Sequence, residues 1–142
     1  MKISTYTGGF VQTNGYLIET PDGNLLIDAP EGIAEWAAHR GVRVDDVLLT
    51  HQHYDHVTDA AALKSLGARL HAFEDYSPEL TLEDTVRSWG MPISVSLSDR
   101  QSFRDDRAVA HRWSRNFTRP RSGALAGQCD IPSSRSRRGV LG

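Results

Sequence analysis

The sequence predicts an α/β fold, in which the strands of a sheet alternate with helices. Two observations indicate it. Short apolar runs bounded by Gly, Pro and Asn recur along the first hundred residues, and segments with apolar residues at helical spacing lie between them. The chain has 142 residues, which is enough for one domain with a hydrophobic core. Its single cysteine excludes a disulfide framework.

The first expected elements are two strands joined by a tight turn. Residues 16–18 run into the Pro-Asp-Gly-Asn turn at 21–24, and residues 25–27 follow as a short buried strand. Residues 30–41 fit a helix that opens with a proline and stops at a glycine. Residues 44–49 are expected to form the next strand, and their apolar end is typical of a strand covered on both faces.

The alternation continues through the next fifty residues. Residues 58–67 fit a helix that Thr58 or Asp59 can cap, and residues 68–73 fit a strand. A helix over 82–89 and a strand over 93–97 follow. Three aromatic side chains are expected in the core: Trp36, Phe73 and Trp89.

The end of the chain has a different composition. Residues 1–103 hold 7 Lys and Arg against 15 Asp and Glu, whereas residues 104–142 hold 9 Arg, no Lys and 3 Asp. Residues 104–142 show no sustained period of strand or helix and resemble a disordered segment. We therefore expect a folded part over 1–103 and a disordered, Arg-rich tail over 104–142.

The residues that carry chemistry follow the strand at 44–49. Residues 50–56 read Thr-His-Gln-His-Tyr-Asp-His. At the end of a strand, positions i and i+2 point the same way, so His51 and His53 can share one metal ion. Asp55 and His56 diverge and can address a second ion nearby. Imidazole and carboxylate donors suit zinc, and also iron or manganese. The alternative interpretation is a solvated polar turn.

The Thr-His-x-His-x-Asp-His motif after a buried strand resembles the signature of the metallo-β-lactamase superfamily, and the resemblance extends over about residues 3–103. Asn14 and Tyr16 lie where the family has Asn-x-Tyr-Leu, and residues 25–28 resemble its Leu-Leu-Ile-Asp motif. Residues 71–80 look like the segment that follows the motif in glyoxalase II-like members. Val57, Thr58 and Asp59 depart from the Gly-Gly that many members have after the motif.

The resemblance implies a role for each residue of the motif. His51 and His53 would bind the first metal ion, and Asp55 and His56 would help to bind the second. Asp55 would also orient the nucleophilic water. Asp28 would support the metal ligands from behind, or would cap the end of its strand instead. His71 could reach the substrate side of the pocket, or could be a satisfied, half-buried histidine.

The family fold is a four-layer αββα sandwich, so residues 1–103 would be its N-terminal half. The family's later ligands are not visible, and we expect an uncovered apolar sheet face and weak or absent activity. Residues 122–129 can be back-translated so that a one-base shift reads Pro-Gly-His-Ser-Pro-Gly-Ser, similar to the family's third ligand motif. Two interpretations of the tail stay open: a frameshift near codons 104–110, or a natural basic tail.

The expected function is that of a metal-dependent, zinc-type hydrolase in which a metal-bound hydroxide attacks a thioester, ester or lactone carbonyl. Its partner would be a small molecule, with hydroxyacylglutathione-like thioesters favoured. Alternatives are a nucleic-acid-binding protein that uses the arginines of the tail, and a metal-binding remnant without turnover. The first residues do not resemble a signal peptide and no apolar run could span a membrane, so we expect a cytoplasmic protein.

Overall fold

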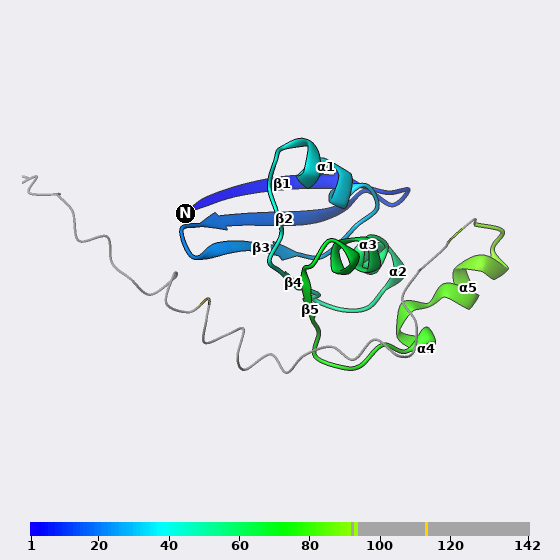
Figure 1. The fold of residues 1–142 in the computed structure, drawn as a ribbon. Helices are drawn as coiled ribbons and strands as arrows, with labels where there is room; N and C mark the ends of the chain where they lie inside the picture. The colour runs from blue at the N-terminus through cyan, green and yellow to red at the C-terminus, as the bar shows by residue number, and fades with distance from the viewer. Residues whose placement is uncertain (92, 94–112, 114–142) are drawn as a thin grey trace, which may run out of the picture.

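The strands form one mixed sheet. The computed structural model describes residues 1–91, 93 and 113, and within them the strand order is β1-β2-β3-β4-β5 (Figure 1). The strands are β1 (Lys2–Gly8), β2 (Thr13–Thr20), β3 (Gly23–Ile27), β4 (Asp46–Leu48) and β5 (Arg69–His71). β1, β2 and β3 pair antiparallel, whereas β4 and β5 run parallel to β3. The predicted α/β fold is confirmed.

The helices are short and connect or follow the parallel strands. They are α1 (Ile33–His39), α2 (Tyr54–Val57), α3 (Ala60–Ser65), α4 (Pro78–Thr81) and α5 (Glu83–Ser88). The sequence did not predict β1, α2 or α4, and the strand expected at 93–97 lies outside the described residues except for Ile93. Among the described residues, no helix combines the length and apolar character needed to cross a membrane.

Helix α1 begins three residues later than its proline suggests. Asp28 and Gly32 both take positive φ angles, 59° and 87°, so the chain changes direction twice before the helix starts. The Asp59 carboxylate accepts a hydrogen bond from the backbone N–H of Ala34, at 2.9 Å, in the first turn of α1. Asp59 was expected to cap its own helix, and it does stand at the N-cap of α3, but its side chain caps α1 instead. Asp59, one of the residues that depart from the family's Gly-Gly, therefore holds the first turn of α1.

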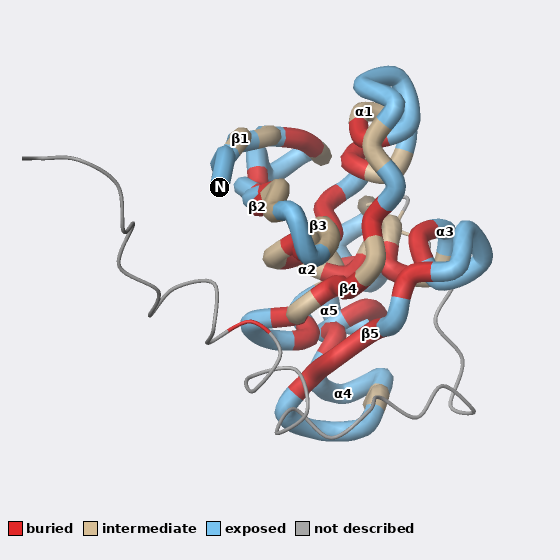
Figure 2. The backbone as a smooth tube through the Cα atoms, turned by 60° about the vertical axis from the view of Figure 1, so that its left-hand side comes forward, coloured by how far each residue is buried: buried red, intermediate tan, exposed pale blue. Residues whose placement is uncertain are grey.

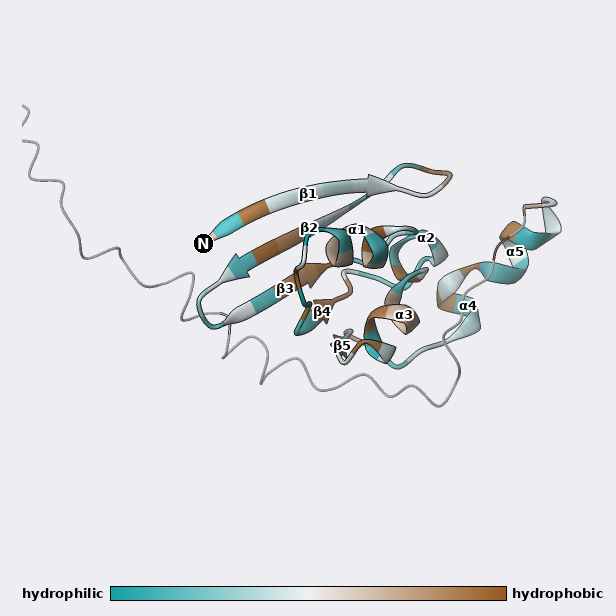
Figure 3. Cartoon of the chain, turned by 45° about the horizontal axis from the view of Figure 1, so that its top comes forward, coloured by the Kyte–Doolittle hydropathy of each residue, from teal (hydrophilic) through white to brown (hydrophobic). Residues whose placement is uncertain are grey.

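The main core lies between the sheet and helices α1 and α3. Leu17, Leu26, Val47 and Leu70 come from four neighbouring strands and are all buried in this core. Figure 2 shows buried stretches of backbone along β4 and β5. Helix side chains close this core from the other side: Ile33, Ala37, Ala60 and Leu63. Because successive strand residues face opposite sides, β2 and β3 are apolar on both faces (Figure 3).

Part of the opposite face of the sheet is covered where the sequence predicted an uncovered surface, although Ile3 beside Ile18 remains exposed. Ile18 and Leu25 are buried there against Trp113, whose side chain is only 3% exposed, and Ile27 and Leu48 pack around them. Trp113 is helical and comes from the segment expected to be disordered. The prediction of an uncovered face is therefore wrong around Ile18 and Leu25; the rest of residues 104–142 lies outside the described residues.

Two of the three aromatic residues expected in the core are on the surface. Phe73 is 90% exposed and Trp89 is 71% exposed. Both residues follow the end of their element, since β5 ends at His71 and α5 ends at Ser88. Trp36 is partly buried, with its ring centroid 5.4 Å from that of Tyr6. The Arg40 guanidinium lies 4.8 Å from the centre of the Trp36 ring.

Candidate metal centre

The site begins where parallel strands β3 and β4 end side by side. Asp28 directly follows β3 and is buried, and its Oδ1 accepts the Thr50 backbone N–H at 2.8 Å. The Thr50 hydroxyl donates to both oxygens of the same carboxylate, at 3.0 and 2.9 Å. Asp28 thus fastens the end of β4. The carboxyl ends of sheet strands are where open α/β sheets place their ligands.

Three histidine rings gather just beyond this junction. The ring centroids of His51 and His53 are 4.5 Å apart, and those of His51 and His56 are 4.0 Å apart. His51 and His53 lie in the extended segment after β4, and His56 lies on the single turn of α2. The structure therefore brings together the three imidazoles that the sequence proposed as ligands.

Two carboxylates flank the ring of His56. Its Nδ1 lies 3.0 Å from Asp28 Oδ2, and its Nε2 lies 3.4 Å from Asp55 Oδ2. His56 Nδ1 is buried and makes no hydrogen bond of acceptable geometry, so the contact with Asp28 is an ion-pair distance only. Asp28 therefore makes both kinds of contact that the sequence left open, with the end of a strand and with a candidate ligand.

Asp55 has a second partner that the sequence did not indicate. The hydroxyl of Thr13, a buried residue on β2, donates to Asp55 Oδ2 at 2.5 Å. Forty-two positions separate the two residues, and nothing in the sequence pattern connects them. The signal that could have found Thr13 is its place beside Asn14, in the part of the chain that resembles the family.

The cluster favours neutral imidazole at His51. Burial lowers the pKa of His51, and the neighbouring His56 and His53 lower it further, whereas Asp28 and Asp55 act in the opposite direction. Metal ions bind the neutral form of histidine, so a lowered pKa makes this ring a better ligand.

The donor set fits a borderline divalent cation by its chemistry, because imidazoles and carboxylates suit zinc, iron and manganese. The buried Nδ1 of His56, which makes no hydrogen bond and lies 3.0 Å from Asp28 Oδ2, adds a nitrogen that could bind metal. In the described part of the chain, however, no group of three or more His, Cys, Asp and Glu side chains is placed as a metal site requires. The described residues therefore supply donors without a closed coordination shell.

His71 lies in a different environment. Its ring is 3% exposed, and its Nε2 lies 2.9 Å from the Oδ1 atom of Asp46, which is itself 1% exposed. Arg69 binds the same carboxylate through two nitrogens, each at 2.7 Å. The Asp46 carboxylate raises the pKa of Arg69. The structure thus places His71 in a buried ion-pair cluster, where its hydrogen-bond and ion-pair partner among the described residues is Asp46 and not His51, His53 or His56.

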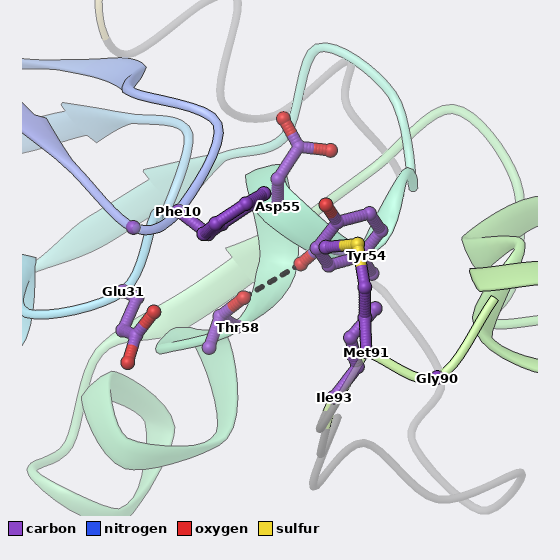
Figure 4. Close-up of a pocket in the computed structure, with 9 residues that line it drawn as sticks. Phe10, Glu31, Tyr54, Asp55, Thr58, Gly90, Met91 and Ile93 are labelled. Atoms are coloured by element: carbon purple, nitrogen blue, oxygen red, sulfur yellow. Dashed lines mark hydrogen bonds between the residues drawn. The ribbon is translucent and has the colours of Figure 1, made fainter. Parts of the chain in front are cut away.

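A pocket of about 400 Å³ opens beside Asp55 (Figure 4). Four separate segments line it: the β1–β2 turn with Phe10, the segment before α1 with Glu31, the helix α2 region with Tyr54 and Asp55, and the segment after α5 with Met91 and Ile93. Thr58 closes one side, and its hydroxyl donates to the backbone oxygen of Tyr54 at 2.7 Å. The sequence did not identify Phe10, Tyr54 or Met91 as site residues, because their proximity depends on the tertiary fold.

Comparison with known proteins assigns the first half of the chain. The sequence model of the Metallo-beta-lactamase superfamily matches residues 8–69, which include the whole histidine motif. Residues 8–69 match this superfamily. The match ends at the first residue of β5, so it covers β2 to β4 and the candidate metal centre and leaves the second half of the chain unassigned.

Curated relatives of this superfamily segment span more than this chain does. A UPF0173 metal-dependent hydrolase of Anaeromyxobacter sp. (strain K) is 29% identical over 119 residues, which cover 68% of this chain and 43% of the relative. Ribonuclease Z of Methanopyrus kandleri is 40% identical over 73 residues, which cover 46% of this chain and 26% of the relative. The chain thus spans less than half the length of these relatives.

Solved structures agree with this assignment. The di-iron-bound form of TTHA1623 is 30% identical with a TM-score of 0.54, covering 71% of this chain and 52% of that protein. The BLEG-1 B3 metallo-beta-lactamase superposes with a TM-score of 0.55 at 22% identity, covering 73% of this chain and 54% of that protein. The mixed sheet therefore matches part of the metallo-beta-lactamase fold.

Proposed function

We propose that this chain carries the first metal-binding segment of a metal-dependent hydrolase. The observation that supports the proposal best is the meeting of His51, His53 and His56 with the carboxylates of Asp28 and Asp55, next to a pocket that Asp55 also lines. Histidines and carboxylates at the end of sheet strands, beside a concave pocket, are the usual setting of metal-assisted hydrolysis.

The proposed roles follow from what each side chain contacts. His51, His53 and His56 would hold a divalent cation, together with Asp55. Asp28 would orient His56 from behind, since carboxylates that contact a ligating histidine fix its ring and raise its basicity. A bound divalent cation at such a site polarises a carbonyl group and makes water more acidic. Thr13 would hold Asp55 in place through its hydroxyl.

The proposed metal is zinc, with iron and manganese as the other candidates, since the donors suit all three. The similar TTHA1623 has a di-iron-bound form, which supports iron as a serious candidate here. The proposed substrates are small molecules with an ester, thioester or lactone carbonyl. The pocket walls supplied by Phe10, Met91 and Ile93 are apolar, and they would accept the acyl chain of such a molecule.

A nucleic-acid substrate is less consistent with the charge of the chain. Residues 1–103, which include the pocket, carry 15 Asp and Glu against 7 Lys and Arg. A polyanion would be repelled by that excess of negative charge. We therefore propose a small-molecule partner.

The test is metal analysis combined with hydrolysis. The chain would be freed of metal, reconstituted in turn with Zn²⁺, Fe²⁺ and Mn²⁺, and assayed on matched ester, thioester and lactone substrates. We expect stoichiometric binding of at least one metal and at most weak hydrolysis, as the missing later ligands predict, which disappears in His53→Ala. His39→Ala is the matched control, because His39 is an exposed histidine on α1.

The possible results separate the hypotheses. Metal bound without any turnover would contradict a hydrolase and favour a metal-binding protein. Hydrolysis that persists in His53→Ala would show that the histidine cluster is not the active centre.

A further inference from the structure

Gln52, between the first two histidines of the motif, faces away from the candidate metal centre. The residues at 51–53 alternate exposed, buried, exposed, as expected of an extended segment. The Gln52 side chain is 6% exposed, whereas His51 and His53 lie on the exposed side. A buried amide needs hydrogen-bond partners, so the contacts of Gln52 must be accounted for.

All the contacts of this amide are with the chain that follows β5. Gln52 Nε2 donates to the backbone oxygens of Glu74 and Asp75, at 2.7 and 3.1 Å. Gln52 Oε1 accepts the backbone N–H of Ser77 at 3.3 Å. One side chain thus holds three backbone groups of the 74–77 segment against the histidine motif.

A second set of contacts continues from that segment to the pocket. The Tyr76 hydroxyl donates to Glu83 Oε1 at 3.3 Å, and Arg87 Nη2 donates to Glu83 Oε2 at 2.8 Å. Glu83 is buried on α5, so its carboxylate depends on these two donors. Arg87 Nε then donates to the backbone oxygen of Ile93 at 3.3 Å.

The last of these contacts reaches the pocket wall. Gly90, Met91 and Ile93 line the pocket together with Tyr54 and Asp55 (Figure 4). Arg87 holds the backbone of Ile93. We call Gln52, Tyr76, Glu83 and Arg87 the Gln52 bridge. The bridge connects Gln52, which lies between the candidate ligands His51 and His53, with the pocket wall formed by Gly90, Met91 and Ile93.

We propose that Gln52 is a positioning residue that couples the histidine cluster to the pocket wall formed by Gly90, Met91 and Ile93. Ordering of one then favours ordering of the other, because a coupling between two sites acts in both directions. The catalytic value of this coupling rests on the hydrolase function proposed above. The coupling itself does not, and it can be measured without any substrate.

The first experiment measures backbone hydrogen exchange in the metal-free chain. Gln52→Ala removes all three hydrogen bonds to the 74–77 segment, and we expect exchange to become roughly tenfold faster over residues 74–91. Strands β1 to β3 should exchange as before. Glu35→Gln, an exposed change on α1, is the control. Unchanged exchange over 74–91 in Gln52→Ala would overturn the proposal.

A second variant tests the far end of the bridge. Arg87 is about half exposed, and Arg87→Gln breaks the contact with Ile93 and also removes the positive charge that pairs with the buried Glu83. We expect faster exchange confined to residues 83–91, with 74–77 unaffected. If Gln52→Ala does not fold, this variant still decides whether the bridge holds the pocket wall. No change over 83–91 would contradict it.

The third experiment tests coupling with Zn²⁺ as the probe. In the wild-type chain, Zn²⁺ should slow exchange over residues 74–91, whereas in Gln52→Ala at equal occupancy it should not. Equal slowing in both proteins would reduce Gln52 to a purely structural role and overturn the proposal. Failure of Zn²⁺, Fe²⁺ and Mn²⁺ to bind wild type would refute the proposed function instead, and the metal-free exchange would still test the bridge.

Kinetics add a measurement that a loss of folding would not mimic. On any substrate that the wild-type chain hydrolyses, Arg87→Gln should raise KM and leave kcat within about twofold, because the pocket wall binds substrate without touching the reacting atoms. Gln52→Ala should change both constants. An unchanged KM in Arg87→Gln would contradict a role of the bridge in shaping the pocket.

Discussion

Strand β4 has a cluster of histidine and carboxylate groups at each end, and the two clusters are built in opposite ways. At its start, Asp46 binds Arg69 through two hydrogen bonds and contacts His71, so a positive guanidinium offsets the buried carboxylate. Beyond its end, Asp28 and Asp55 both pair with His56, and in the described residues no Lys or Arg pairs with either.

The difference separates a structural cluster from a candidate metal centre. A buried carboxylate is stable only when it is paired or when it coordinates a metal ion. The Asp46 cluster is complete in this respect, whereas the cluster around His56 has two carboxylates for one partly buried imidazole. A divalent cation would supply the missing positive charge there. Residue type alone does not distinguish the clusters, because both contain histidine and aspartate.

The largest expected effect is on stability at the start of β4. Asp46→Ala should lower the free energy of unfolding by roughly 3–5 kcal/mol, because it leaves His71 and Arg69 without their shared buried partner. Urea denaturation of the metal-free chain measures it. A loss below about 1 kcal/mol would remove the contrast between the two clusters.

The second effect is on metal binding beyond the end of β4. His53→Ala should weaken Zn²⁺ binding by more than the roughly 10–100-fold that loss of a residue behind a ligand costs. Because His53 is exposed, the free energy of unfolding of the metal-free chain should change by less than about 0.5 kcal/mol. Competition with a chromophoric chelator gives the affinity. Unaltered affinity would remove His53 from the metal centre.

A smaller loss of affinity is expected for Asp28→Asn. Asparagine tolerates the positive φ of 59° at this position and can still accept the Thr50 hydrogen bonds, but it cannot offer a charged partner to His56. Zn²⁺ affinity should fall about 10–100-fold. Asp45→Asn is a control, since that carboxylate contacts Asn24 and Arg43 at the start of β4. If the two variants lowered Zn²⁺ affinity equally, the effect would come from loss of a negative charge anywhere nearby and not from loss of the contact between Asp28 and His56.

The smallest effect is expected at a histidine outside both clusters. His39 lies exposed on α1 with Glu35 at 3.9 Å. His39→Ala should change the free energy of unfolding by less than about 0.5 kcal/mol and should leave Zn²⁺ affinity unaltered. A clear loss of metal in this variant would mean that the chain binds zinc through scattered surface histidines.

Local sequence patterns predicted much of the fold and of the site. The Pro-Asp-Gly-Asn turn places β2 against β3, and the apolar run that ends at Leu49 leads directly into the histidine motif, as the structure shows. The spacing of His51 and His53 was enough to expect their rings together, whereas His56, expected at a second ion nearby, lies with its ring 4.0 Å from that of His51. These features depend on residues close in sequence, where backbone geometry alone limits the arrangement.

Features that depend on distant residues were missed or mistaken. Phe73 and Trp89 looked like core residues by type, but the points where β5 and α5 end leave them on the surface. Asp59 looked like the cap of its own helix, but α1 lies close enough to take its carboxylate. In each case the sequence showed what kind of side chain was present, an apolar ring or a capping carboxylate. It could not show which part of the folded chain would lie next to that side chain.

By itself the sequence determined the α/β fold, the presence of strands β2 to β5 along the chain and the chemistry of the motif at 50–56. Only the tertiary structure decided that Thr13 holds Asp55, that Trp113 covers Ile18 and Leu25, and that Gln52 fastens the segment at 74–77. The physical reason is that strand and turn preferences act between neighbours in sequence. A buried hydroxyl or amide is instead satisfied by whichever group the folded chain brings within 3 Å, and no local pattern records that partner.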